Sequence, residues 1–159
     1  MTNQIEFNKE DIYDDLKKSI EKEILQKNEK DKNDCKSINI WKNAINLIEK
    51  KNYNDAYELI LNSGDDIYLL RLILITGIKL NYLKFDIAKK VLMRVNMICR
   101  SHQIQLLLIN LIKDSIQTHI YSNLNRNEQN DILDSLYEFS GFNTTIGAQA
   151  AYLYEKLTS

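Results

Sequence analysis

The chain has 159 residues, of which 44% are hydrophobic, and its formal net charge at pH 7 is −1. This size and composition predict one domain with its own core. The balanced charge, without a recognised nucleic-acid-binding motif, gives no support to a nucleic-acid or membrane partner. No apolar run approaches the ~18 residues that a membrane-spanning helix needs. The absence of proline and the presence of only 4 glycines favour an all-α fold, because both residues interrupt helices.

Residues 1–36 are predicted to be a charged N-terminal helix and linker, preceding a helical-hairpin domain over residues 37–159. The helix is expected from about Lys9 to Lys30, where aliphatic residues form a narrow stripe among mixed charges. The stripe repeats every fourth position: Ile12, Leu16, Ile20 and Ile24. Such a helix either lies on the domain or associates with a partner, because a narrow stripe is also typical of a short coiled-coil seam. A homo-oligomer formed through residues 1–36 is therefore one expected arrangement.

The location of the protein is indicated by its first residues and its cysteines. The N-terminus is polar and acidic and lacks the apolar stretch of a secretory signal peptide. A cytoplasmic protein is expected. Cys35 and Cys99 lie in unlike contexts and are expected to be reduced in that compartment.

From Ser37 onward the sequence predicts successive helices. The first has one apolar face, made of Ile38, Trp41, Ala44, Ile45 and Ile48. The second begins at a polar cap, Asn54 and Asp55, and is closed by Gly64, the residue best suited to a left-handed conformation. Asp65 is then expected to cap a third helix, from Asp65 to Thr76, that ends at Gly77. That helix is apolar nearly all round and is predicted to be buried, with the other helices packed around it.

The first three of these helices also carry a family resemblance. The residues concerned are Trp41, Ala44, Tyr53–Tyr57, Leu61, Ser63–Asp66, Leu69–Leu72 and Thr76–Gly77. They resemble the C-terminal helical domain of the TORTIFOLIA/SPIRAL family of microtubule-associated proteins. That domain has an aromatic-alanine helix, an Ala-Tyr start, a Gly-Asp turn, a leucine-rich helix and a Thr-Gly-Pro end. Ile78 replaces the family's proline, and beyond about Lys113 the likeness is of helical character alone.

Four more helices are predicted after Gly77. The helix from about Lys84 to Arg100 is sharply amphipathic, and Ser101 can cap the next one, which runs to about Tyr121. Asn125 and Glu128 have the spacing of a capping box for the following helix, which ends at Gly141. A last helix spans Asn143 to Leu157, and Gly147 inside it indicates a close approach of two helices.

The short linkers require consecutive helices to pack as antiparallel hairpins. The predicted fold is therefore all-α, an irregular stack of antiparallel helix hairpins with about seven helices, comparable to a HEAT or tetratricopeptide superhelix.

No catalytic, cofactor or metal site is predicted. His102 and His119 lack a neighbouring His or Cys at ligand spacing, and no glycine-rich phosphate loop is present. Asp65 and Asp66 are explained as capping residues of the buried helix rather than as paired acids. A protein that is not an enzyme is expected.

The predicted partner-binding surface is the outer face of the helix from Lys84 to Arg100. Its cationic and methionine side chains are Lys84, Lys89, Lys90, Met93, Arg94, Met97 and Arg100. On the sequence they are opposed nearby only by Asp86, and methionines offer adaptable apolar contacts between the charges. Such a face could receive an acidic segment, such as a tubulin tail, or could simply be a solvated lysine-rich face. The region of Trp41, with Lys42, Lys50 and Lys51, is a second candidate, although Trp41 itself is interpreted as a core residue.

The resemblance implies a non-catalytic interaction module of a microtubule-associated protein. Such a module would support association with microtubules or tubulin, or assembly with a cytoskeletal partner, at the cytoskeleton. The alternative is a general scaffold or adaptor domain of the tetratricopeptide or HEAT type, unrelated to microtubules. These two hypotheses differ in the partner and not in the fold.

Overall fold

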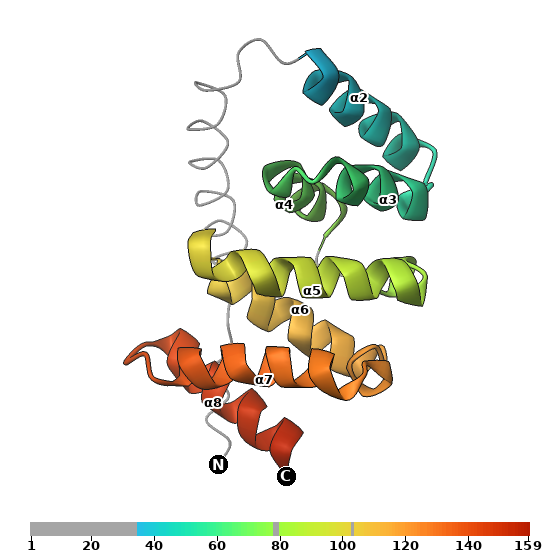
Figure 1. The fold of residues 1–159 in the computed structure, drawn as a ribbon. Helices are drawn as coiled ribbons and strands as arrows, with labels where there is room; N and C mark the ends of the chain where they lie inside the picture. Colours follow the sequence, from blue (N-terminus) through green and yellow to red (C-terminus); the bar gives the residue numbers. More distant parts are fainter. Residues whose placement is uncertain (1–34, 78–79, 103) are drawn as a thin grey trace.

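The computed structural model describes residues 35–77, 80–102 and 104–159, and all regular structure in them is helical (Figure 1). Seven α-helices occur there: α2 (Cys35–Glu49), α3 (Tyr53–Ser63), α4 (Asp66–Thr76), α5 (Phe85–His102), α6 (Gln105–Gln117), α7 (Arg126–Ser140) and α8 (Thr145–Thr158). Two short 3-10 helices, η1 (Leu80–Tyr82) and η2 (Tyr121–Asn123), lie in the connections before α5 and α7. The all-α prediction is confirmed. The helix predicted over Lys9 to Lys30 lies outside the described residues.

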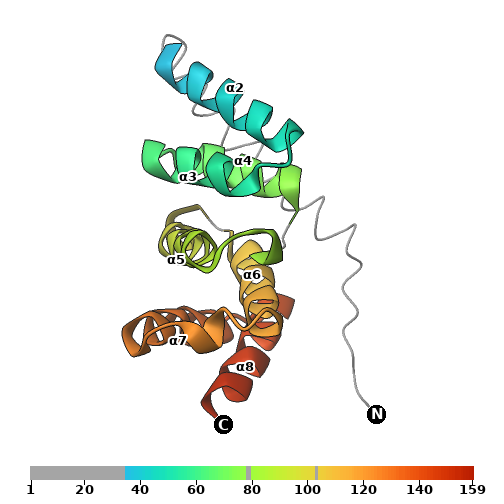
Figure 2. The same ribbon diagram turned by 90° about the vertical axis from the view of Figure 1, so that its right-hand side faces the viewer.

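The helices form two layers of a stack. Figure 2 shows α3, α5 and α7 in one column and α4, α6 and α8 in the other, with α2 beyond α3. Consecutive helices pack as hairpins, α3 with α4, α5 with α6 and α7 with α8, while α3, α5 and α7 contact one another in series along the first layer. The predicted stack of antiparallel hairpins is therefore present in the described residues.

The centre of the stack is a continuous apolar core to which α4 and α6 contribute on several sides. Leu70, Leu72 and Ile73 of α4 are at most 1% exposed, and Leu108 and Ile112 of α6 are fully buried. The predicted burial of the third helix is thus confirmed for Ile67, Leu69, Leu70, Leu72 and Ile73. The end of the helix is less covered, because Leu74 is only partly buried and the side chain of Ile75 is 50% exposed.

Several helix ends follow the capping rules predicted from the sequence. Gly64 has φ 72° and closes α3, and the Asp65 side chain accepts a hydrogen bond of 3.0 Å from the Tyr68 backbone N–H. Asn125 and Glu128 form both hydrogen bonds of a capping box at the start of α7. These interactions satisfy backbone groups that a helix end would otherwise leave unpaired.

Two predicted caps are wrong. α3 begins at Tyr53, and the Asn54 side chain accepts a 2.7 Å hydrogen bond from the backbone N–H of Lys84, just before α5. Asn54 therefore ties the start of α5 to α3 rather than capping its own helix. Ser101 does not begin the next helix, because α5 continues to His102 and α6 begins only at Gln105.

Gly147 marks a close approach, although the nearest backbone is that of the α7–α8 turn and not of a neighbouring helix. A Cβ atom built at this position would overlap the backbone carbonyl oxygen of Phe142 and would lie 3.2 Å from that of Phe139. The backbone at the α7–α8 turn therefore lies directly against the first turn of α8. Only glycine leaves room for this contact.

Candidate partner-binding surface

The residues that carry the family resemblance have structural roles in the α2–α4 region. The Tyr57 hydroxyl and the Thr76 side chain form a 2.5 Å hydrogen bond that joins the middle of α3 to the end of α4. Trp41 of α2 stacks on Tyr68 of α4 with ring centroids 5.2 Å apart, and the Arg71 guanidinium lies 4.7 Å from the Trp41 ring centroid. Trp41 is partly buried by these contacts, so the motif explains how three helices pack.

The outer face of α5 is tied to its neighbours by two ion pairs. Lys89 Nζ lies 2.9 Å from Glu128 Oε2 of α7, and Arg94 Nε lies 2.7 Å from Asp66 Oδ1 at the start of α4. The expectation that only Asp86 opposes the cations of this face is therefore wrong. Carboxylates distant in sequence are brought to it by the packing of α4 and α7.

Glu128 remains charged in this arrangement. Burial raises the pKa of its carboxyl group, but the backbone N–H of Asn125 and the ammonium group of Lys89 together lower it by more. The net pKa lies below the ordinary value of a glutamate. Lys89 is thus engaged with a permanent negative charge at neutral pH, which leaves it less able to bind an acidic partner.

Of the remaining predicted residues, Lys84 and Lys90 are exposed, and no ion pair involves either of them within the described residues. Met93 is partly buried, and Met97 is 58% exposed. The backbone of Arg100 belongs to α5, and its side chain lies outside the described part of the structure.

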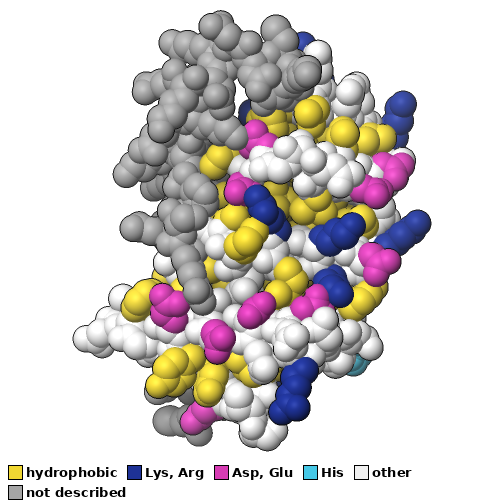
Figure 3. Space-filling model, viewed as in Figure 1, with side chains coloured by type: hydrophobic (Ala, Val, Ile, Leu, Met, Phe, Trp, Pro, Cys, Tyr) yellow, Lys and Arg dark blue, Asp and Glu magenta, His cyan; other side chains and the backbone are white. Residues whose placement is uncertain are grey.

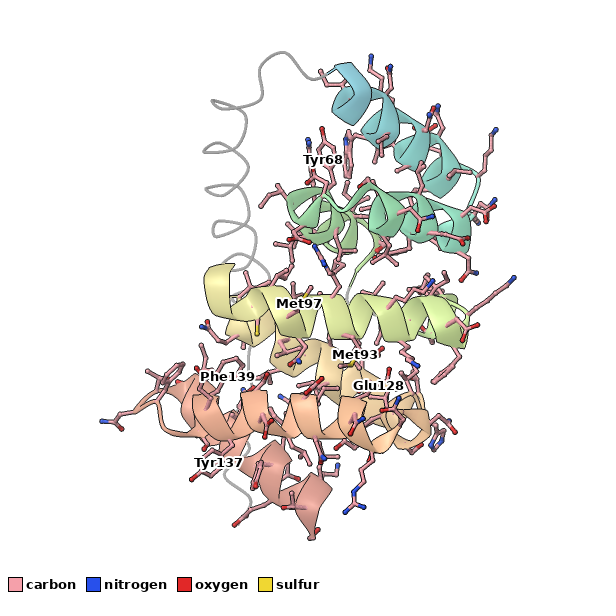
Figure 4. All side chains as sticks on the ribbon, viewed as in Figure 1. Tyr68, Met93, Met97, Glu128, Tyr137 and Phe139 are labelled. Carbon is pink, nitrogen blue, oxygen red and sulfur yellow. The ribbon has the colours of Figure 1, made fainter. Side chains whose placement is uncertain are left out.

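A groove with a volume of about 710 Å³ lies over α5, between α3 and α7. Its lining is Leu61 and Asn62 of α3, Lys90, Met93, Arg94, Asn96 and Met97 of α5, and Asp131 and Asp134 of α7. We call this the α5 groove. Figure 4 places Met93 and Met97 on α5, with Glu128 on the adjacent α7. The groove brings together four of the seven predicted partner-binding residues.

The electrostatic character of the α5 groove is mixed. Figure 3 shows basic and acidic side chains interspersed across the face of α3, α5 and α7, without a continuous basic patch. Asp131 and Asp134 stand on the α7 side, opposite the cations of α5. Asn96 is held in place, because its side-chain oxygen accepts a buried 2.7 Å hydrogen bond from Ser135. The groove is therefore a shaped surface with apolar, cationic and anionic parts.

The helical periodicity of the sequence identified the α5 side of this groove, but it did not identify the sides formed by α3 and α7. Leu61, Asn62, Asp131 and Asp134 belong to helices that precede or follow α5 in the chain. A hairpin stack places every second helix side by side. Applied to the predicted helices, that rule could have nominated the helix after Asn125 as the neighbour of α5.

Two other classes of site receive no support from the described residues. Within residues 35–77, 80–102 and 104–159, no cluster of three or more His, Cys, Asp or Glu side chains could hold a metal ion. In the same ranges no helix is long and apolar enough to cross a membrane.

Comparison with known proteins identifies the family. Residues 37–159 match the family described as TORTIFOLIA1 C-terminal. No curated protein matches the chain, and no solved structure does, so the likeness to HEAT or tetratricopeptide arrays stays a prediction. The match covers most of the sequence, including the region beyond Lys113 where only helical character was recognisable. This chain therefore belongs to the TORTIFOLIA1 C-terminal family, whose members are microtubule-associated proteins.

Proposed function

We propose that the chain is a non-catalytic interaction module of a microtubule-associated protein, and that it binds a segment of a protein partner in the α5 groove. The observation that carries this proposal is the pair of methionines that line the groove, of which Met97 has a side chain that is 58% exposed. Methionine is flexible and polarisable, and it suits a surface that adapts to a partner. Ion pairs with Glu128 and Asp66 already engage Lys89 and Arg94, so Lys90 and Met97 are exposed groove residues that a partner can contact.

Two kinds of partner segment fit the α5 groove. An acidic tubulin tail would be attracted by the exposed Lys90 and by Lys84 nearby, which supports direct contact with the microtubule. A segment of mixed charge from a cytoskeletal adaptor would use Lys90 together with Asp131 and Asp134 on the opposite side. Asp131 and Asp134 would repel an acidic tail and attract the cations of a mixed-charge segment, so both partners are tested below.

The two kinds of partner are distinguished by reversing the charge of Lys90 on the α5 side of the groove and, separately, of Asp131 and Asp134 on the α7 side. Lys90→Glu should weaken binding to microtubules about fivefold in a co-sedimentation assay, because one attraction becomes a repulsion. The double variant Asp131→Lys, Asp134→Lys should strengthen binding of an acidic tail, and should weaken binding of a mixed-charge adaptor. All three positions are exposed, so their thermal stabilities should match that of the unmodified chain.

Charge reversal of the ion-paired Lys89 or Arg94 is the comparison for charge reversal of the exposed Lys90. Their reversal would place a negative charge against Glu128 or Asp66 and would lower stability as well as binding. Microtubule binding that is unchanged by Lys90→Glu and by the double aspartate variant would rule out the α5 groove as the contact surface.

A further inference from the structure

Of the sulfur-bearing side chains that the structure describes, one is open to solvent, and it lies in the α5 groove. The side chain of Met97 is 58% exposed, whereas Met93 is partly buried and Cys99 is fully buried. The thiol of Cys99 also donates a 3.1 Å hydrogen bond to the backbone carbonyl oxygen of Asn96. An oxidant in solution would therefore reach Met97 first, because oxidation of sulfur follows its exposure.

Met93 and Met97 lie about one helical turn apart on α5, and both line the α5 groove (Figure 4). The two side chains differ in their packing. Met93 packs against the apolar core of the domain, while more than half of the Met97 side chain faces solvent. One turn of α5 thus presents a protected thioether and an accessible thioether to the same groove.

We propose that Met97 is a reversible oxidation site, and that its conversion to the sulfoxide by a peroxide weakens binding in the α5 groove. The effect on binding rests on the proposed function, whereas the selectivity for Met97 does not. A sulfur lone pair attacks one oxygen of hydrogen peroxide, the S–O bond forms as the O–O bond breaks, and a proton transfer between the two oxygens releases water. Sulfur is oxidised and the peroxide is reduced. Methionine sulfoxide reductases reverse the step with electrons from thiols, giving the thioether and water.

The sulfoxide changes the chemistry that the groove offers to a partner. A flexible apolar side chain becomes a polar one, whose new oxygen is a hydrogen-bond acceptor. Asp131 and Asp134 line the same groove, and their ionised carboxylates can only accept hydrogen bonds as well. Lys90 lies about two helical turns away along α5. An apolar group of the partner that contacts Met97 would therefore desolvate an unpaired sulfoxide oxygen, which costs free energy.

The fold should tolerate oxidation of Met97. In the free chain the sulfoxide oxygen stays hydrated at this exposed position, so the free energy of unfolding should change little. Oxidation of Met93 would instead place a polar oxygen against the core and would destabilise the domain. The accessible methionine is thus the one whose oxidation can alter binding without unfolding the chain.

Limited oxidation of the full chain by hydrogen peroxide, followed by mass spectrometry and microtubule co-sedimentation, tests the proposal. Trypsin cleavage after Arg94 separates the two methionines, because it yields the peptides 91–94 and 95–100. Met97 should be oxidised at least about fivefold faster than Met93. Once catalase has removed the peroxide, the oxidised chain should bind microtubules about threefold more weakly, with an unchanged melting temperature.

Two leucine variants are each compared with themselves before and after oxidation. Met97→Leu should lose no affinity on treatment with peroxide, because leucine has no sulfur to oxidise. Met93→Leu keeps the exposed thioether and should lose about threefold in affinity, as the unmodified chain does.

The outcomes separate this inference from the proposed function. Oxidation of Met93 as fast as that of Met97 would overturn the oxidation site. Equal pelleting before and after oxidation of Met97, or equal losses in the two leucine variants, would overturn its effect on binding. A chain that does not pellet before treatment would overturn the proposed function and the effect on binding together, and the rates measured on the two peptides would still decide the oxidation site.

Discussion

Replacing Gly147 with alanine is expected to lower the free energy of unfolding by about 3 kcal/mol. The added Cβ would overlap the Phe142 carbonyl oxygen, which belongs to the backbone and cannot turn aside as a side chain would. Relief requires α8 to move away from the α7–α8 turn, and that movement loosens contacts of the buried Ala150 and Leu153. Chemical denaturation followed by circular dichroism measures the loss.

Gly141 supplies a matched control for this substitution. It lies at the end of α7 with φ −75°, and a Cβ there would approach the Glu138 carbonyl oxygen only to 3.4 Å. Gly141→Ala should therefore be neutral or stabilising by about 0.5 kcal/mol, because alanine restricts the unfolded chain. If both variants were equally stable, the close approach at Gly147 would not exist in solution.

Raising the pH from 10 to 12 is expected to destabilise the domain by up to about 3 kcal/mol through Tyr57 alone. Burial raises the pKa of Tyr57 from 10.0 to about 12, and the hydrogen bond with Thr76 lowers it only partly. In this interval the unfolded chain loses the phenolic proton while the folded chain keeps it. Stability is therefore fully present below pH 10 and is lost as the pH rises toward 12.

Tyr57→Phe isolates this contribution. The ring is retained, and Thr76 keeps its 3.0 Å hydrogen bond to the Leu72 carbonyl oxygen, so the loss at neutral pH should be about 1 kcal/mol. The difference in stability between the variant and the unmodified chain should reverse in sign above pH 10. Parallel stability curves for the two chains up to pH 12 would show that Tyr57 is accessible to solvent.

Local signals in the sequence predicted the helices and their ends well. Gly64 with Asp65, and Asn125 with Glu128, act within one turn of the backbone, so their effect depends little on the rest of the fold. The amphipathic pattern of α5 correctly separated its buried side from its polar side. These features depend on residues three or four positions apart, and a helix fixes that geometry by itself.

Interactions between helices could not be predicted in the same way. Arg94 meets Asp66 across 28 positions, and Asn54 accepts a hydrogen bond from Lys84 across 30. Helical periodicity states which side of a helix faces the core, but it does not say which residue of another helix stands opposite. The basic face predicted on α5 therefore became a groove of mixed charge once α4 and α7 were placed beside it.

The family motif is expected to stabilise the domain, whereas the α5 groove is expected to bind the partner. Tyr57, Thr76 and Trp41 join α2, α3 and α4, so their substitution should act on partner binding only through stability. Met97 has the opposite character, because it is exposed and its loss should affect binding without unfolding the domain.

The most direct test of this account is co-sedimentation of the chain with microtubules across a salt series, with Met97→Asp as the binding variant. Tyr152→Asp, at a 64% exposed position on α8, is the matched control. We expect salt-sensitive pelleting of the unmodified and control chains, a reduction of about tenfold in affinity for Met97→Asp, and equal melting temperatures for all three. Pelleting of the unmodified chain that is matched in full by Met97→Asp would contradict the assignment of microtubule binding to the α5 groove.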